Sequence, residues 1–204
     1  GYGDLLVGAS AAPPGGRAYL YRGGRTGLDP TTVTELIGPD GADSRFGGAL
    51  AGAGDLNADG FADVIVGADG TSREAGRAFV YRGGRAGLGV VPWVEPLSAV
   101  HGRFGRSVAG VGDLNGDGYP DVAVGEPNAE FIGRVLVFAG SASGVPAQPA
   151  LAIVSPGRMP GEFGGSVASA GDFDGDGFGD LAVGSPRMAD DLGGVQLFRG
   201  GTGG

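Results

Sequence analysis

Three sequence signatures recur together in each repeat, two of them at intervals of 58 or 59 residues and the third at intervals of 57 or 60, and this period constrains the fold more than any other property. A Phe-Gly pair followed by small residues and an aspartate begins at Phe46, Phe104 and Phe163. An aspartate followed by three apolar residues and a glycine begins at Asp4, Asp63, Asp121 and Asp180. A third segment, rich in apolar and aromatic residues, begins at Gly16, Gly76, Gly133 and Gly193. Such internal repetition is typical of architectures in which each repeat is one supersecondary unit.

The period also decides how the glycine content is interpreted. The 204 residues include 47 glycines and 13 prolines, a share that in a sequence without periodicity indicates low complexity or disorder. Nearly every glycine cluster is in phase with the repeat, and the hydrophobic residues, 41% of the chain, form short dense clusters. The glycines therefore indicate repeated turns in a folded chain that has a hydrophobic core.

Each repeat contains segments with the composition of short β-strands. They are rich in Val, Leu, Phe and Tyr, they are bounded by Gly, Pro or Asp, and none shows a helical period over ten residues. In the repeat that starts at Phe46, strands are expected at 46–55, 63–67, 77–84 and, in a more divergent segment, 92–97; the divergent segment has counterparts at 31–37 and 150–154. The strand expected at 63–67 and its counterparts in the other repeats are apolar at consecutive positions, which indicates burial on both faces between two neighbouring sheets.

Four short strands per repeat predict an all-β fold, a β-propeller whose four-stranded blades pack face to face around an axis. The small residues of the 46–55 type suit the crowded position nearest that axis. A Greek-key sandwich is the alternative, although it does not require a three-part signature at constant spacing.

We expect the blades to be divided as follows. The chain forms a single propeller region over 1–204, with a partial blade at 1–40, blades at 41–99 and 100–157, and a partial blade at 158–204. It thus supplies about three and a half blades. We expect further blades, from a longer chain or from another chain, to complete the ring.

Charge and composition exclude several functional classes. The net charge is −9, from 23 acidic residues and 14 basic residues that are all arginine, which disfavours binding to the phosphate backbone of nucleic acids. The apolar runs are only a few residues long, against the roughly 20 residues that cross a bilayer, so we expect no membrane insertion. The sequence has no cysteine, which excludes disulfides, thiol catalysis and zinc–thiolate sites.

Three aspartate-rich loops carry the strongest functional signal. We name them acidic loop 1 (residues 55–63), acidic loop 2 (113–121) and acidic loop 3 (172–180), and each follows the pattern D-x-[DN]-x-D-G-x-x-D. Carboxylates this close repel one another unless a cation lies among them, and an oxygen-only donor set suits Ca²⁺ better than Zn²⁺. The first six positions resemble an EF-hand loop, but the last carboxylate comes at position nine rather than at position twelve.

The pattern predicts side-chain ligands at positions one, three, five and nine and a main-chain carbonyl ligand at position seven, hence about three calcium sites. The residues are Asp55, Asn57, Asp59, Phe61 and Asp63 in acidic loop 1, Asp113, Asn115, Asp117, Tyr119 and Asp121 in acidic loop 2, and Asp172, Asp174, Asp176, Phe178 and Asp180 in acidic loop 3. The alternative is that these residues only form Asx turns. Three copies in phase favour metal binding over turns alone.

The Phe-Gly pairs, the three acidic loops and the Gly-x-Pro segments at Gly125 and Gly184 together resemble the FG-GAP repeat family, typified by the N-terminal propeller of integrin α subunits. The counterparts at Gly8 and Gly67 depart from the Gly-x-Pro pattern. The resemblance covers essentially the whole chain. It implies a seven-bladed propeller with Ca²⁺ bound by loops on one face and partners bound on the opposite face or rim.

The loops expected at the end opposite the acidic loops differ among the repeats. A ligand-reading surface would show such divergence, and so would a lack of constraint. Candidate ligand contacts there are Arg73, Glu74, Glu126, Glu130, Arg158, Arg187, Asp190 and Asp191. The Arg-Gly-Gly triplets at Arg22, Arg82 and Arg199 each end a predicted strand and are interpreted as turns.

These features predict a non-enzymatic, extracellular or cell-surface binding module for a protein ligand, braced by Ca²⁺. The sequence shows no Ser/His/Asp set, and the clustered carboxylates are better explained as metal ligands than as a glycosidase pair. Two alternatives remain open: a carbohydrate-binding propeller similar to fungal lectins, and the non-catalytic propeller portion of a larger secreted enzyme.

Overall fold

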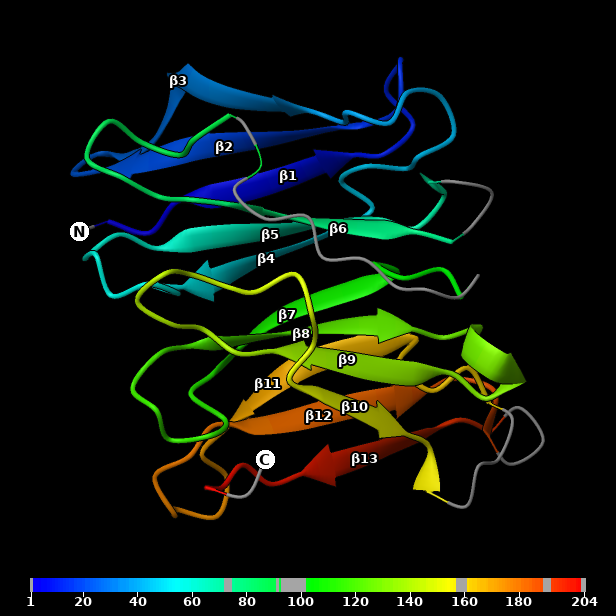
Figure 1. Cartoon of the computed structure of the whole chain (residues 1–204). Coiled ribbons are helices and arrows are strands. Elements are labelled where there is room, and N and C mark those ends of the chain that lie inside the picture. The colour runs from blue at the N-terminus through cyan, green and yellow to red at the C-terminus, as the bar shows by residue number, and fades with distance from the viewer. Residues whose placement is uncertain are drawn as a thin grey trace.

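The computed structural model describes residues 2–71, 75–90, 92, 102–156, 161–188 and 192–202. In this part of the chain, thirteen β-strands form four antiparallel sheets. Figure 1 shows the sheets following one another, from the N-terminal sheet at the top to the C-terminal sheet at the bottom. The described residues include no helix that is long and apolar enough to cross a membrane.

Each sheet is built from strands that are consecutive in the chain, and each strand pairs with the next. The first sheet contains β1 (Leu5–Ala9), β2 (Arg17–Gly24) and β3 (Gly27–Ile37). The second contains β4 (Ala49–Gly54), β5 (Asp63–Ala68) and β6 (Arg77–Tyr81). The third contains β7 (Ser107–Gly112), β8 (Asp121–Glu126), β9 (Arg134–Phe138) and β10 (Leu151–Val154), with the 3-10 helix η1 (Ala129–Phe131) between β8 and β9. The fourth contains β11 (Ser166–Gly171), β12 (Asp180–Ser185) and β13 (Gly194–Phe198).

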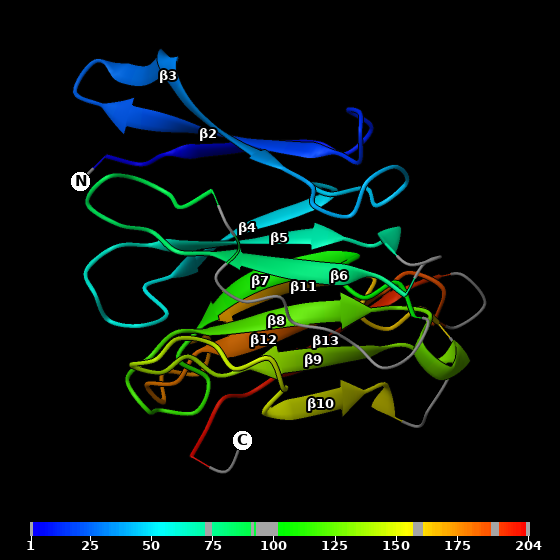
Figure 2. The same cartoon turned by 45° about the horizontal axis from the view of Figure 1, so that its top comes forward.

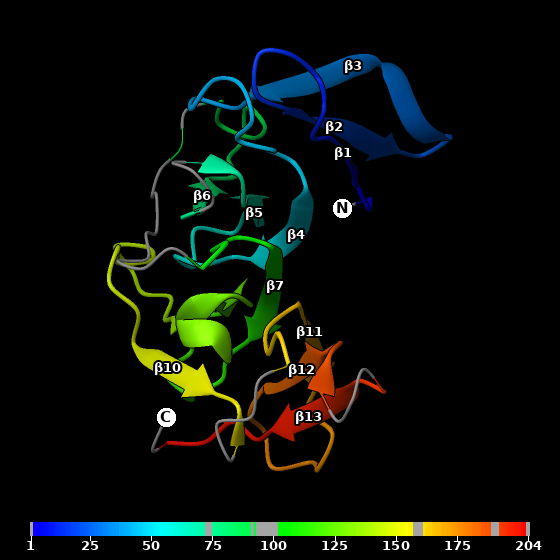
Figure 3. The ribbon, with the colours of Figure 1, turned by 90° about the vertical axis from the view of Figure 1, so that its right-hand side faces the viewer.

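The sheets are arranged as the blades of a β-propeller. Figure 3 shows the strands β4, β7 and β11 following one another along one side of the molecule, while β6 and β10 lie on the opposite side. Figure 2 shows the same succession of sheets from another direction. The small residues of these strands permit close approach, since a Cβ atom at Gly110 of β7 would overlap the backbone of Gly52 and Ala53. The all-β propeller predicted from the repeat is confirmed, and the third sheet has the expected four strands.

The buried strands are those with consecutive apolar positions. Every residue of β5 and β8 is buried, and so are five of the six residues of β12. β1 has the same type of sequence but is exposed or half-buried throughout, because within the described residues it lies at the edge of a sheet that has a neighbouring sheet on one face only. The strand expected at 92–97 falls outside the described residues, apart from position 92.

The Phe-Gly pairs join successive sheets. Phe46, Phe104 and Phe163 are completely buried, and each forms an isolated parallel bridge with a glycine that precedes a strand of the previous sheet. At one of these joints the backbone N–H of Phe104 donates a hydrogen bond to the carbonyl of Ala75 at 2.9 Å. The predicted strand at 46–55 therefore begins only at Ala49, because its first residues connect the sheets.

Candidate metal centre

The three acidic loops lie at the same end of the sheets. They connect β4 to β5, β7 to β8 and β11 to β12, and all three are on the left in Figure 1. The connection from β1 to β2, and the one from β8 through η1 to β9, lie on the right. The strand order predicts this separation between acidic loops and divergent loops.

The aspartate at position nine begins a strand and connects each acidic loop to the turn after the following strand, which is β6, β9 or β13. Asp63, Asp121 and Asp180 are buried. In each case Oδ2 accepts a hydrogen bond from the backbone N–H at position two, at 3.0 Å from Leu56, 2.9 Å from Leu114 and 2.8 Å from Phe173. Oδ1 accepts one from a glycine N–H, at 2.8 Å from Gly83, 3.0 Å from Gly140 and 2.9 Å from Gly200. Both carboxylate oxygens therefore stabilise the blade itself.

The aspartate at position one folds each loop around its own carboxylate. In acidic loop 2, Asp113 Oδ1 accepts hydrogen bonds from the N–H groups of Gly116 (2.7 Å) and Asp117 (3.1 Å), and Oδ2 accepts one from Gly118 (2.8 Å). Gly118, at position six, has a φ of 90°, which favours glycine. The turns proposed in the alternative interpretation are thus present. They do not compete with metal binding, since a carboxylate oxygen has two lone pairs.

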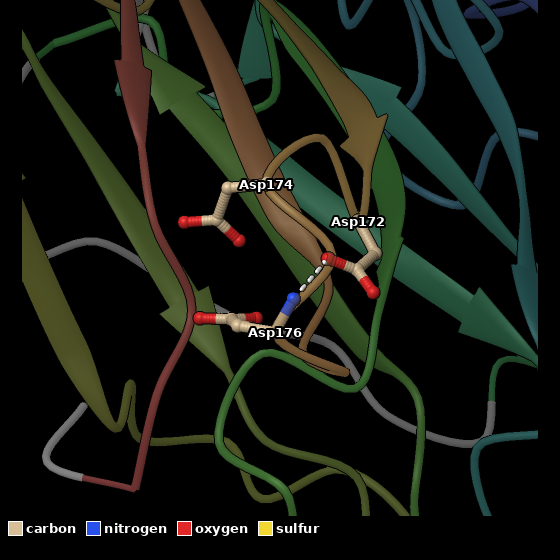
Figure 4. Close-up of side chains that lie close together, drawn as sticks. All are labelled: Asp172, Asp174 and Asp176. Carbon is tan, nitrogen blue, oxygen red and sulfur yellow. Dashed lines mark hydrogen bonds between the residues drawn. The ribbon is translucent and has the colours of Figure 1, made fainter.

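In acidic loop 3 the first three predicted side-chain ligands converge (Figure 4). One carboxylate oxygen from each of Asp172, Asp174 and Asp176 lies within 4.8 Å of the others, and all three residues are exposed. The backbone N–H of Asp176 donates to Asp172 Oδ1 at 3.0 Å. Asp180, the predicted fourth side-chain ligand, is not part of this group. The structure therefore brings together positions one, three and five.

Acidic loops 1 and 2 have asparagine at position three. The side-chain amides of Asn57 and Asn115 each donate to Oδ2 of the position-five aspartate at 3.1 Å. The position-seven residues, whose carbonyls are predicted ligands, donate their own N–H to Oδ1 of that aspartate, at 3.0 Å from Phe61 and 2.9 Å from Tyr119. Positions three, five and seven are therefore connected by hydrogen bonds in acidic loops 1 and 2. In acidic loop 3, Phe178 makes the same bond to Asp176 at 3.0 Å.

Charge and burial shift pKa values in opposite directions within the loops. The Arg82 guanidinium, hydrogen-bonded to Asp59, lowers the pKa of that carboxyl. Burial raises the pKa of Asp63 and raises that of Asp121 to about 6. A cation close to the buried carboxyls would favour their charged form.

The donor chemistry of the loops fits calcium. The predicted ligands are carboxylate, amide and carbonyl oxygens in a short turn, which is the donor set that Ca²⁺ takes in flexible geometry. No nitrogen or sulfur donor of the kind preferred by Zn²⁺ belongs to the pattern. The residues present therefore fit a calcium ion, and in acidic loop 3 three of the carboxylates already converge.

The sequence analysis did not predict that two arginines contact the acidic loops. Arg82 contacts Asp59 of acidic loop 1, with Nη2 2.8 Å from Oδ2, and Arg199 contacts Asp174 of acidic loop 3, with Nε 3.2 Å from Oδ2. Both belong to Arg-Gly-Gly triplets, for which the sequence predicts only turns. Their constant place in the repeat, one residue before the glycine that binds the position-nine aspartate, was the available signal.

The predicted ligand contacts at the opposite end are described only in part. Arg73, Glu74, Arg158, Asp190 and Asp191 lie outside the described residues. Glu130 is exposed in η1 with a φ of 50°. Arg187 is exposed, and its Nη1 lies 2.9 Å from Glu162 Oε1.

Glu126 requires a correction. Its side chain is completely buried, and its Oε2 accepts a hydrogen bond from Arg134 Nε at 2.6 Å. It is the last residue of the buried strand β8, so the strand carries it into the protein and it does not reach a ligand-binding surface. The sequence prediction also omitted Phe131, which is 91% exposed beside Glu130. An aromatic residue in a polar segment outside the strands was the signal for it.

Comparison with known proteins agrees with the repeat. The FG-GAP repeat model matches residues 46–81, 104–138 and 163–198. Integrin alpha-PS5 from Drosophila melanogaster is 39% identical over 148 residues, which is 66% of this chain and 14% of the relative. Integrin alpha-5 from Xenopus laevis is 33% identical over 195 residues, 89% of this chain and 18% of the relative. Human integrin alpha-IIb is 37% identical over 155 residues, 70% of this chain and 15% of the relative.

These matches cover about two thirds or more of this chain but only a small part of each relative. The chain spans less than a fifth of the length of each of these three integrin alpha chains. Within the chain itself, the matched repeats contain the Phe-Gly joints, the acidic loops and the three strands that surround them. By its three repeats and their geometry, this chain belongs to the FG-GAP repeat family.

Proposed function

We propose that this chain is part of a non-enzymatic, extracellular or cell-surface adhesion module that binds a protein ligand, with Ca²⁺ bracing its propeller. One observation carries the proposal: three acidic loops of the same pattern lie at one end of the sheets, each anchored by a buried position-nine aspartate. The similarity to integrin alpha chains supports the adhesion role. The blade division expected from the repeat, and its completion by further blades, belong to the same proposal.

Calcium has a structural role in this proposal. In each loop the ion is held by side-chain oxygens at positions one, three and five and by the carbonyl at position seven, with position nine contributing from the base of the loop. It neutralises carboxylates that otherwise repel one another, and millimolar calcium outside cells saturates even weak sites of this kind. The ion stabilises the loops and takes part in no reaction.

The protein ligand is proposed to bind at the opposite end. Among the described residues there, Phe131 and Leu192 are 91% and 87% exposed, and Glu130 and Arg187 supply charge nearby in the sequence. Aromatic side chains and arginine are enriched at protein–protein interfaces and their hot spots. Exposed apolar and charged groups in divergent loops therefore fit a protein surface.

Thermal unfolding of the chain in EDTA and in 5 mM Ca²⁺ tests the calcium proposal. A site filled at 100 times its Kd stabilises by about 2.7 kcal/mol, and 1 kcal/mol raises the Tm of a chain of this size by about 2–4 °C. We expect Ca²⁺ to raise the Tm by at least about 5 °C. The triple variant Asp59→Ala, Asp117→Ala, Asp176→Ala should lose this response, and identical melting in EDTA and Ca²⁺ would refute the structural role.

Binding to arrays of purified secreted proteins and of glycans, both in Ca²⁺, tests the ligand proposal. We expect protein targets whose binding weakens in Phe131→Ser, while the Tm of this variant stays unchanged because the side chain is exposed. The matched control is Tyr2→Ser, an aromatic that is 59% exposed in the segment before β1, which should bind the same targets as the unmodified chain. Binding to glycans alone would replace the proposal by the carbohydrate-binding alternative.

A further inference from the structure

The three blades that carry acidic loops differ in the residue that follows their third strand. Arg82 follows β6, Ala139 follows β9 and Arg199 follows β13. Each directly precedes the glycine whose N–H binds the position-nine aspartate of its blade. Its place relative to the acidic loop is therefore the same in all three blades, and its side chain is either a guanidinium or a methyl group.

In acidic loop 1 the guanidinium of Arg82 contacts an oxygen that is predicted to bind the metal. Arg82 Nε and Nη2 lie 2.9 Å and 2.8 Å from Asp59 Oδ2. The same oxygen accepts a hydrogen bond from the Asn57 amide at 3.1 Å, and Oδ1 accepts one from the N–H of Phe61 at 3.0 Å. For Asp59 Oδ2 to bind a cation, the Arg82 contact must be released or the ion must approach a positive charge.

Acidic loop 2 is a natural comparison because its predicted donor set is identical: aspartate, asparagine, aspartate, carbonyl and aspartate. Asp117 Oδ2 accepts the Asn115 amide at 3.1 Å, and Oδ1 accepts the N–H of Tyr119 at 2.9 Å. With Ala139 in place of the arginine, its carboxylates make no ion pair with any described residue. The two loops thus differ by one positive charge at a ligand atom.

Acidic loop 3 combines an arginine with an additional carboxylate. Position three is Asp174 instead of asparagine, and Arg199 Nε lies 3.2 Å from its Oδ2. The Arg199 guanidinium carbon also lies 5.8 Å from the centre of the Phe173 ring. The arginine therefore offsets the carboxylate that distinguishes this loop from the other two, and the net charge of loop and arginine equals that of acidic loop 2.

We propose that these arginines grade the calcium affinity of the three loops, that is, they make it differ from loop to loop. Acidic loop 1 has the lowest affinity and fills last, and acidic loop 2, which has no arginine, binds calcium more tightly than acidic loop 1. This inference rests on the proposed calcium role and adds its regulation: blade-specific filling as the calcium concentration changes. Its physical basis is ligand charge, because Ca²⁺ affinity in oxygen loops follows the number of carboxylates and a neighbouring cation repels the ion. Arg82 acts as a positioning residue that competes with the metal for Asp59.

Calcium titration followed by NMR tests the grading loop by loop. The reporters are the position-six amides of Gly60, Gly118 and Gly177, each of which donates to the position-one aspartate of its own loop. We expect the Gly118 and Gly177 signals to shift at lower Ca²⁺ than the Gly60 signal. Arg82→Ala should lower the Gly60 midpoint about threefold to tenfold and leave the Gly118 and Gly177 midpoints in place. The reverse change, Ala139→Arg, should raise the Gly118 midpoint by a similar factor.

Arg85→Ala is the matched control. Arg85 is exposed three residues beyond Arg82 and has no hydrogen bond or ion pair with any described residue, so this variant makes the same change of net charge without touching Asp59. It should leave the Gly60 midpoint unchanged. An unchanged Gly60 midpoint in Arg82→Ala, or equal midpoints for all three loops, would overturn the grading while leaving calcium binding intact. If none of the three glycine signals responds to Ca²⁺, the proposed function itself fails.

Discussion

The carboxylate of Asp121 and the backbone N–H of Gly140 are joined by a 3.0 Å hydrogen bond that connects the start of β8 with the turn after β9. The other oxygen of Asp121 accepts the N–H of Leu114 at 2.9 Å, and the residue is only 1% exposed. A buried backbone donor left without an acceptor costs about 1–3 kcal/mol. Asp121 therefore supports the blade through two backbone groups independently of any metal ligation.

Asp121→Ala should lower the free energy of unfolding by about 2–4 kcal/mol in EDTA, because two backbone donors lose their acceptor. Asp117→Ala, at exposed position five of the same loop, should cost less than about 1 kcal/mol in EDTA and should remove the calcium response of acidic loop 2. Urea unfolding at pH 7.5, with EDTA or with Ca²⁺, measures both effects. Equal losses for the two variants in EDTA would show that Asp121 has no special structural role.

Gly125→Ala should destabilise the chain by about 3 kcal/mol or more. A Cβ atom at this position of β8 would overlap the carbonyl oxygen of Gly164, just before β11 of the next sheet, and the hydroxyl of Ser107. The backbone of β8 or of Gly164 must therefore shift to admit it. Gly52→Ala in β4 is the control, since a Cβ there meets nothing within 4 Å. It should be neutral or stabilise by about 0.5–1 kcal/mol. Equal melting temperatures for the two variants would contradict the close contact between sheets.

Phe104→Ala should cost about 3–5 kcal/mol, the usual range for a fully buried phenylalanine. The ring is 0% exposed and packs edge-on against Phe138 with 6.1 Å between ring centres. Phe131→Ala removes the same atoms from a side chain that is 91% exposed and should change stability by less than about 0.5 kcal/mol. Denaturant unfolding compares them, and a small loss in Phe104→Ala would mean that the Phe-Gly joint does not hold the sheets together.

The sequence predicted the strands well because the repeat marks them several times over. The expected strand at 46–55 nevertheless begins at Ala49, since a single repeat does not reveal that Phe46 pairs with Gly16 of the preceding sheet. The acidic pattern identified the loop residues, but it assigned position nine to the metal alone. It could not show that both oxygens of Asp63 accept backbone hydrogen bonds from Leu56 and Gly83, because the second donor is 20 residues away.

Side chains outside the repeat pattern were predicted less well. The sequence predicts only a turn at Arg82, because its contact with Asp59 depends on two segments that meet only in the folded blade. The divergence of the residues after Glu126 predicts that Glu126 belongs to a ligand-binding loop. Its position at the end of the apolar run of β8 places it inside the protein, where burial of a carboxylate requires a partner.

That partner leads to the last prediction. Glu126 is 0% exposed, and its Oε2 accepts a hydrogen bond from Arg134 Nε at 2.6 Å. Glu126→Ala should cost about 3 kcal/mol, because it leaves the largely buried guanidinium without its carboxylate. Glu130→Ala, in the exposed loop that follows, should cost less than about 0.5 kcal/mol. The double variant Glu126→Leu, Arg134→Met should recover most of the loss, since it replaces both charges of the pair. Urea unfolding of these variants measures the coupling between the two side chains. A double variant no more stable than Glu126→Ala would mean that the loss does not come from the broken pair, and a neutral Glu126→Ala would return this residue to the candidates for ligand binding.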